Sequence, residues 1–129
     1  MLINILIVDD KLMIREGIKY LLHDLKITND TYEACDGFQA IEITKKKSFD
    51  IILMDISMPN LDGISATKEI MKNNSNNKII AISMHTDKND IKKMQKAGAK
   101  GYVLKDTIAN TLQNAIDKTL SKEEFFILK

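Results

Sequence analysis

The sequence is poor in cysteine, proline and tryptophan, with one Cys, one Pro and no Trp among 129 residues. The single thiol, Cys35, can form neither an internal disulfide nor a cysteine zinc cluster, and we expect it as a small buried residue in a strand. The longest apolar runs have about six residues, far short of the roughly 20 that cross a bilayer. The first residues have no basic region followed by an apolar stretch and a small-residue cleavage site, so we expect no secretory signal. These absences predict a cytoplasmic protein without membrane contact.

Charge of one sign is not in excess either. The net charge at pH 7 is +1, with 29% charged and 44% hydrophobic residues. A chain so balanced has no global attraction for nucleic acid or for an anionic membrane. Its length suits one domain with one core. We assign residues 1–120 to that domain and residues 121–129 to a C-terminal tail.

Five apolar runs alternate with five amphipathic stretches along the chain. The predicted strands span residues 3–8, 31–35, 51–54, 78–83 and 101–104. The predicted helices span residues 14–25, 38–46, 64–71, 87–96 and 108–120. This alternation predicts an α/β fold with a doubly wound parallel sheet and helices on both faces. Five strands favour the flavodoxin-like order 2-1-3-4-5.

Polar side chains occur where the apolar runs end. Asp9 and Asp10 follow the first run, and Asp55 follows the third. Ser83 ends the fourth run and Lys105 follows the fifth. The carboxyl ends of parallel strands share one edge of a sheet, and ligands bind there beside the switch point between the first and third strands. We therefore expect these five side chains on one rim.

This rim predicts phosphoryl chemistry supported by a metal ion. Three carboxylates held within a few ångströms repel one another, and a hard cation such as Mg²⁺ relieves the repulsion. An aspartate can accept a phosphoryl group, a transfer that needs positioning and neutralisation of the phosphoryl oxygens. Mg²⁺, the Lys105 ammonium and the Ser83 hydroxyl would each serve one of these oxygens.

Several motifs, taken together, resemble the receiver domain of bacterial two-component response regulators over roughly residues 3–120. They are Val8-Asp9-Asp10, Met54-Asp55, Met58-Pro59-Asn60-Leu61-Asp62-Gly63, Ser83 and Ala97-Gly98-Ala99-Lys100-Gly101-Tyr102-Val103-Leu104-Lys105. The Ser-Met-His stretch at 83–85 and the Gly-Tyr-Val-Leu-Lys-Asp ending at 101–106 are similar to the NarL/LuxR class.

The resemblance implies roles at the acceptor site. Asp55 would be the phosphoacceptor, with Lys105 against the phosphoryl group. Mg²⁺ would be held by Asp9, Asp10, Asp55 and the backbone carbonyl of Ser57. The donor would be a phosphohistidine on a partner sensor histidine kinase. The domain would not be an enzyme beyond accepting the phosphoryl group and slowly losing it.

The resemblance also implies a switch and an output. Ser83 and Tyr102 match the switch pair of the family, and phosphorylation would change the face formed by stretches 87–96, 101–104 and 108–120. The first of these stretches has a thin apolar stripe, so little burial holds it in place. The output would be transcription regulation, through this face or through a homodimer formed on phosphorylation. DNA would be bound only by a C-terminal effector domain absent from this chain.

Some residues have a second interpretation. Asp9 and Asp10 could cap the first helix, Ser83 could satisfy local backbone, and Tyr102 could bury its ring and leave its hydroxyl in water. Many members of the family place a proline after the lysine, often with a cis bond. Here Asp106 follows Lys105, so no cis bond is assumed.

The tail, residues 121–129, carries four large apolar residues near its end. One interpretation is a tail packed on the domain. The interpretation we prefer is the start of a linker to a further domain.

Three other functions fit parts of the pattern. A phosphatase of the haloacid dehalogenase type needs a second Asp two residues after the nucleophile, where this chain has Ser57. A flavodoxin-type FMN carrier would have its phosphate repelled by Asp9 and Asp10. A receiver that acts only through protein contacts would not need the full acid set together with Ser83 and Lys105.

Overall fold

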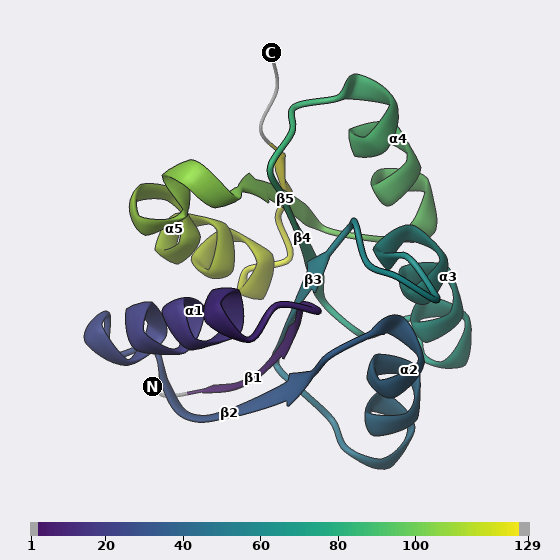
Figure 1. Ribbon diagram of the computed structural model, residues 1–129. Helices are drawn as coiled ribbons and strands as arrows, with labels where there is room; N and C mark the ends of the chain where they lie inside the picture. The colour runs from purple at the N-terminus through teal and green to yellow at the C-terminus, as the bar shows by residue number, and fades with distance from the viewer. Residues whose placement is uncertain (1–2, 127–129) are drawn as a thin grey trace.

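The structure, a computed structural model, describes residues 3–126 as alternating strands and helices (Figure 1). The strands are β1 (Ile3–Val8), β2 (Thr28–Ala34), β3 (Ile51–Asp55), β4 (Ile79–Ser83), β5 (Gly101–Leu104) and β6 (Phe125–Phe126). The helices are α1 (Leu12–Asp24), α2 (Gly37–Lys46), α3 (Gly63–Asn73), α4 (Lys88–Ala97) and α5 (Ile108–Leu120), with a 3₁₀ turn, η1, at Lys105–Thr107.

The strands form one parallel sheet in the order β2-β1-β3-β4-β5-β6. The first five strands have the expected 2-1-3-4-5 order, so the doubly wound, flavodoxin-like prediction is confirmed. The expected number of five strands is wrong, because Phe125–Phe126 adds a sixth beside β5.

The sixth strand forms because Phe125 and Phe126 point to opposite faces of the sheet and each meets an apolar cluster. Successive residues of a strand point to opposite faces. Phe126 packs against the apolar cluster that contains Tyr102, and Phe125 packs against the cluster that contains Val103. The Phe125 N–H also donates to the Lys100 carbonyl at 3.0 Å. Pairing here covers part of the β5 edge, whose backbone groups would otherwise face solvent.

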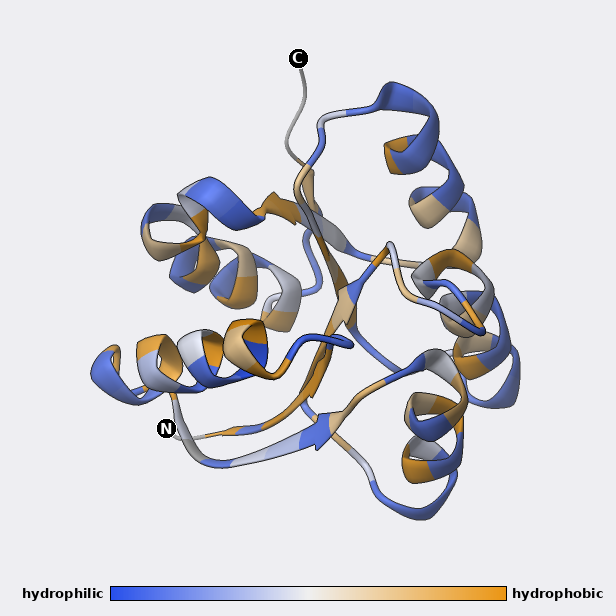
Figure 2. Cartoon of the chain, in the orientation of Figure 1, coloured by the Kyte–Doolittle hydropathy of each residue, from blue (hydrophilic) through white to orange (hydrophobic). Residues whose placement is uncertain are grey.

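Helices cover both faces of the sheet (Figure 1). α1 and α5 pack over one apolar cluster, and α2, α3 and α4 pack over the other. β3 and β4 are buried along their whole length, which explains their uninterrupted apolar sequences. Figure 2 shows hydrophobic strands at the centre and hydrophilic outer helix surfaces. Among residues 3–126, no helix has both the length and the hydrophobicity that spanning a membrane requires.

The second strand differs from its prediction at both ends. β2 begins at Thr28 and ends at Ala34, so Cys35 lies outside it. The Cys35 N–H donates to the Gln39 side chain at 3.0 Å instead of joining the sheet, and the Asp36 side chain caps α2 by accepting the Gln39 N–H. Cys35 is exposed, so its expected burial is wrong.

Candidate functional site

Three carboxylates meet at the carboxyl ends of β1 and β3. Asp9 and Asp10 follow β1, and Asp55 is the last residue of β3. One oxygen from each lies within 4.8 Å of the others. The two strands are neighbours, with Val8 paired to Met54, because the strand order reverses between them. Asp9 and Asp55 are buried, so their repulsion is poorly screened by water.

The Lys105 ammonium provides the positive charge beside these acids. It lies 2.9 Å from Asp9 Oδ2 and 3.2 Å from Asp55 Oδ1, and its side chain is 11% exposed. Burial alone would lower the pKa of Lys105, but its hydrogen bond to Asp9 and the charge of Asp55 raise that pKa above its usual value. The lysine therefore stays charged between the two carboxylates.

One cation does not balance three acids. Burial, and after it the charge of Asp9, raises the pKa of Asp55 to about 6, although Lys105 and the Ser57 backbone N–H act in the opposite direction. Asp55 Oδ2 is buried and accepts no hydrogen bond from the described residues. An all-oxygen cluster with an unpartnered buried carboxylate oxygen fits a hard divalent cation such as Mg²⁺.

Ser83 and Tyr102 both bond to the backbone of His85. Ser83 ends β4 and is buried, and its Oγ accepts the His85 N–H at 3.0 Å. The Tyr102 ring is fully buried, and its hydroxyl donates to the His85 carbonyl at 2.9 Å. The hydroxyl thus meets protein, not water, and the two residues fix the same point in the loop before α4.

The interpretation of Asp9 and Asp10 as helix caps is wrong. The N-cap of α1 is Lys11, without a side-chain cap bond. Asp9 Oδ1 instead accepts the Lys11 N–H at 2.9 Å, which orders the loop while Oδ2 faces Lys105. None of the peptide bonds within residues 3–126 is cis, so the bond between Lys105 and Asp106 is trans.

Gly63 allows the loop after β3 to fold back under Asp55. Its N–H donates to the Ile56 carbonyl at 2.8 Å. A Cβ at Gly63 would overlap the Asp55 carbonyl oxygen, which no side chain tolerates. The motif's glycine is thus explained by a close approach of two backbone segments.

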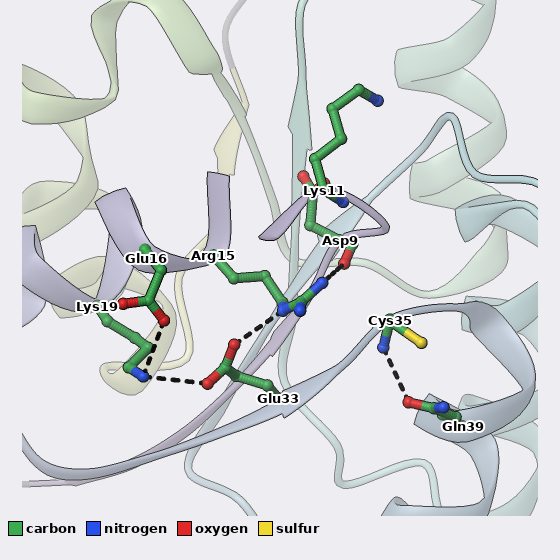
Figure 3. Close-up of polar contacts among 8 residues, drawn as sticks. All are labelled: Asp9, Lys11, Arg15, Glu16, Lys19, Glu33, Cys35 and Gln39. Atoms are coloured by element: carbon green, nitrogen blue, oxygen red, sulfur yellow. Dashed lines mark hydrogen bonds and ion pairs between the residues drawn. The ribbon is translucent and has the colours of Figure 1, made fainter. Parts of the chain in front are cut away.

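Arg15 is a site residue that sequence reasoning missed. Its Nη1 donates to the Asp9 carbonyl at 2.7 Å, and its Nε donates to Glu33 at 2.8 Å (Figure 3). One signal could have indicated it, since Arg15 is the only arginine among 19 Lys and Arg residues. A guanidinium presents several donors in a fixed plane, which an ammonium does not.

This fold and this rim define a class of doubly wound α/β domains with an acid cluster and a lysine at the switch point. The chain belongs to the response regulator receiver domain family, which it matches over residues 5–117. It is 34% identical to the response regulator UvrY of Escherichia coli K12 over 124 residues, covering 96% of this chain and 57% of UvrY. It is 35% identical to the transcriptional regulatory protein DegU of Brevibacillus brevis over 114 residues, covering 88% of this chain and 48% of DegU.

Solved structures agree with this assignment. A LuxR-family two-component response regulator from Aurantimonas sp. SI85-9A1 superposes with a TM-score of 0.91 at 30% identity, over 97% of this chain and 89% of that one. The response regulator domain of Thermotoga maritima CheB superposes with a TM-score of 0.82 at 27% identity, over 94% and 98%. The chain spans about half the length of the curated relatives above.

Proposed function

We propose that this chain is a phosphorylation-dependent signalling switch whose phosphoacceptor is Asp55. The observation that carries the proposal is the placement of Asp55 at the tip of β3, within the acid cluster and 3.2 Å from the Lys105 ammonium. A nucleophilic carboxylate, a nearby cation and a cluster suited to Mg²⁺ are the parts that phosphoryl transfer to an aspartate needs.

The transfer itself is a displacement at phosphorus. A carboxylate oxygen of Asp55 forms a bond to phosphorus as the P–N bond of a phosphohistidine breaks, and the imidazole of the partner sensor histidine kinase keeps the electron pair. Lys105 lies where it can neutralise a phosphoryl oxygen, exchanging part of its contact with Asp55 for the new group. The work of the protein is positioning and charge balance.

We further propose that Asp9, Asp10, Asp55 and the backbone carbonyl of Ser57 hold Mg²⁺. When bound, Mg²⁺ neutralises charge on the carboxylates and on a phosphoryl oxygen. Asp9 and Asp55 are buried, so packing already holds their carboxylates in the cluster. Lys105 contacts Asp55 at Oδ1, which leaves Asp55 Oδ2 available to the metal.

The switch would act through Ser83 and Tyr102. A phosphoryl group adds roughly −1.5 to −2 charge and acceptor oxygens, to which the Ser83 hydroxyl could donate. Turning toward them would carry Ser83 Oγ away from the His85 N–H that it now accepts. Both residues bond to His85, so a turn of Ser83 would alter the loop before α4. α4 buries only Ile91, Met94 and Ala97, and an element with so little burial moves at low cost.

The wider assignments extend this proposal. Residues 1–120, with β6 of the tail added to their sheet, would form the receiver domain. The tail would lead into an effector domain that binds DNA and regulates transcription in the cytoplasm. UvrY and DegU, of which the chain covers 57% and 48%, support this organisation. A homodimer formed on phosphorylation is part of the same proposal.

The test is the intact mass of the protein after incubation with acetyl phosphate, with and without Mg²⁺. Wild type should gain about 80 Da, one phosphoryl group, only when Mg²⁺ is present. Asp55→Asn should gain nothing. Asp106→Asn is the matched control, because Asp106 is an exposed acid beside Lys105 that lies outside the cluster. Phosphorylation of Asp55→Asn, or failure of folded wild type with both acetyl phosphate and a phosphorylated kinase, would contradict the proposal.

A further inference from the structure

Arg15 joins the acid cluster to the neighbouring edge strand. Its Nη1 reaches the carbonyl of Asp9 at the end of β1, and its Nε reaches Glu33 Oε1 on β2, as Figure 3 shows. The Arg15 side chain is 13% exposed. A guanidinium tolerates this burial better than an ammonium because it is more weakly hydrated.

The bond to Asp9 acts on a residue that is held at four atoms. The Asp9 N–H donates to the Ala34 carbonyl at 3.1 Å, and the Asp9 carbonyl accepts from Arg15. Asp9 Oδ1 accepts the Lys11 N–H, while Oδ2 lies against Lys105. The first two contacts fix the peptide planes on either side of Asp9. The direction in which its carboxylate enters the cluster depends on those planes.

The other end of the Arg15 side chain is anchored. Glu33 Oε1 accepts from Arg15, and Glu33 Oε2 accepts from Lys19 at 3.1 Å (Figure 3). Lys19 also contacts Glu16 at 3.2 Å. Since Glu33 is held from two sides, the guanidinium cannot rotate freely away from Asp9.

We propose that Arg15 is a positioning residue for the cluster, anchored by Glu33, which sets the orientation of Asp9 and thereby the affinity for Mg²⁺. The proposal rests on the proposed function only in taking Mg²⁺ as the ion of the cluster. It explains why the one arginine of the chain stands here. Two acceptors on the ends of two strands need two donors in fixed geometry.

Two simpler roles for Arg15 predict results that differ from those of the positioning role. As a mere positive charge near the acids, Arg15 would repel Mg²⁺, so its removal would tighten Mg²⁺ binding. As a mere tie between α1 and β2, it would be equivalent to Lys19, which contacts the same Glu33 from the same helix without reaching Asp9. Lys19→Ala is therefore the matched control.

The experiment is calorimetric titration of Mg²⁺ into wild type, Arg15→Ala, Arg15→Lys, Glu33→Gln and Lys19→Ala. Amide hydrogen exchange at Lys11, whose N–H bonds to Asp9 Oδ1, is measured on the metal-free proteins. Arg15→Ala should bind Mg²⁺ at least about tenfold more weakly, a usual cost of losing a partner that orients a ligand. Its Lys11 amide should exchange faster.

The other variants locate the effect. Arg15→Lys keeps the positive charge but lacks the planar set of donors, so its affinity for Mg²⁺ should stay below that of wild type. Glu33→Gln should lose less Mg²⁺ affinity than Arg15→Ala. Lys19→Ala should match wild type in both measurements. Unchanged or tighter binding in folded Arg15→Ala would overturn the proposal. If Arg15→Ala does not fold, the test falls to Arg15→Lys and Glu33→Gln. The proposal would be overturned if both variants bound Mg²⁺ with the affinity of wild type and exchanged the Lys11 amide at the wild-type rate.

The two proposals fail in different ways. Wild type that is phosphorylated on Asp55, with no effect of the Arg15 variants on Mg²⁺ binding, refutes only the role of Arg15. Mg²⁺ binding that depends on Arg15 in a protein that never gains a phosphoryl group refutes the proposed function and supports the positioning role.

Discussion

The Tyr102 hydroxyl donates a hydrogen bond to the backbone carbonyl of His85, with 2.9 Å between the two oxygens. Burial raises the pKa of this hydroxyl above its ordinary value, so it stays a donor at neutral pH. The bond joins β5 to the loop between β4 and α4. Tyr102, a residue of β5, thus holds the loop at His85, which the Ser83 hydroxyl also contacts.

Tyr102→Phe should therefore loosen that loop. The buried ring would remain, but the His85 carbonyl would lose its donor, at a cost of about 1 kcal/mol in the free energy of unfolding. Urea unfolding measures the cost, and hydrogen exchange over residues 84–87 measures the loop. Tyr20→Phe serves as the control because Tyr20 is 76% exposed. Equal loop exchange in both variants would show that the hydroxyl does not hold the loop.

Asp55 should make the metal-free protein less stable as the pH rises. Its folded pKa of about 6 lies above the unfolded value of roughly 3.9, so the folded state binds the proton more tightly. Ionisation between about pH 4 and pH 6 therefore costs folding free energy, and the full cost of about 2–3 kcal/mol is present above that range.

Asp55→Asn removes this cost. In a chelator at pH 8, the variant should be more stable than wild type by about 2 kcal/mol, with the difference vanishing towards pH 4. Urea unfolding followed by circular dichroism at several pH values gives the comparison. Mg²⁺ should narrow the difference at pH 8, because it binds the wild-type carboxylates. A wild type that gains stability over the variant as pH rises would contradict the assignment.

Gly63→Ala should disrupt the backbone of the acceptor. The added Cβ would overlap the Asp55 carbonyl oxygen, so the loop must move, at a cost of about 3 kcal/mol or more in stability. Gly17→Ala is the matched control, since a Cβ at Gly17 meets nothing within 4 Å. That change in α1 should raise stability by about 0.5–1 kcal/mol. Thermal unfolding of the two variants should therefore shift in opposite directions.

Phe126→Ala should show that β6 belongs to the domain. Phe126 is half-buried against the cluster that contains Tyr102, so its loss should cost about 1–2 kcal/mol in stability. Phe38→Ala, at a side chain that is 55% exposed, should cost less. Identical urea midpoints for Phe126→Ala and wild type would mean that the tail does not pack on β5 in solution.

The elements of the sheet were predictable because their signals are local. Ile51 to Asp55 is uniformly apolar before its terminal acid, and such a run predicts a strand covered on both faces. The thin apolar stripe of α4 was equally visible, and the helix buries three residues. The edges were less predictable. Cys35 and Phe125 lie where pairing depends on a neighbour far along the chain, and periodicity carries no information about that neighbour.

The site divides in the same way. Strand ends at Asp9, Asp55 and Lys105 placed these residues on one rim by topology alone, since parallel strands present their carboxyl ends together. The contact between Arg15 and Asp9 was not predictable, because it depends on the direction of one side chain six residues away. Nor did the sequence indicate that Ser83 and Tyr102 meet at His85.

The sequence by itself determined the fold class, the strand order of the first five strands and the family of this protein. These follow from periodicity and from motifs that each lie within one short segment. Only the tertiary structure decided the sixth strand, the exposure of Cys35, and two hydrogen bonds. These are the bond from the Tyr102 hydroxyl to the His85 carbonyl and the bond from Arg15 to the Asp9 carbonyl. Each of these depends on how side chains and strand edges lie in space, which packing sets and local pattern does not.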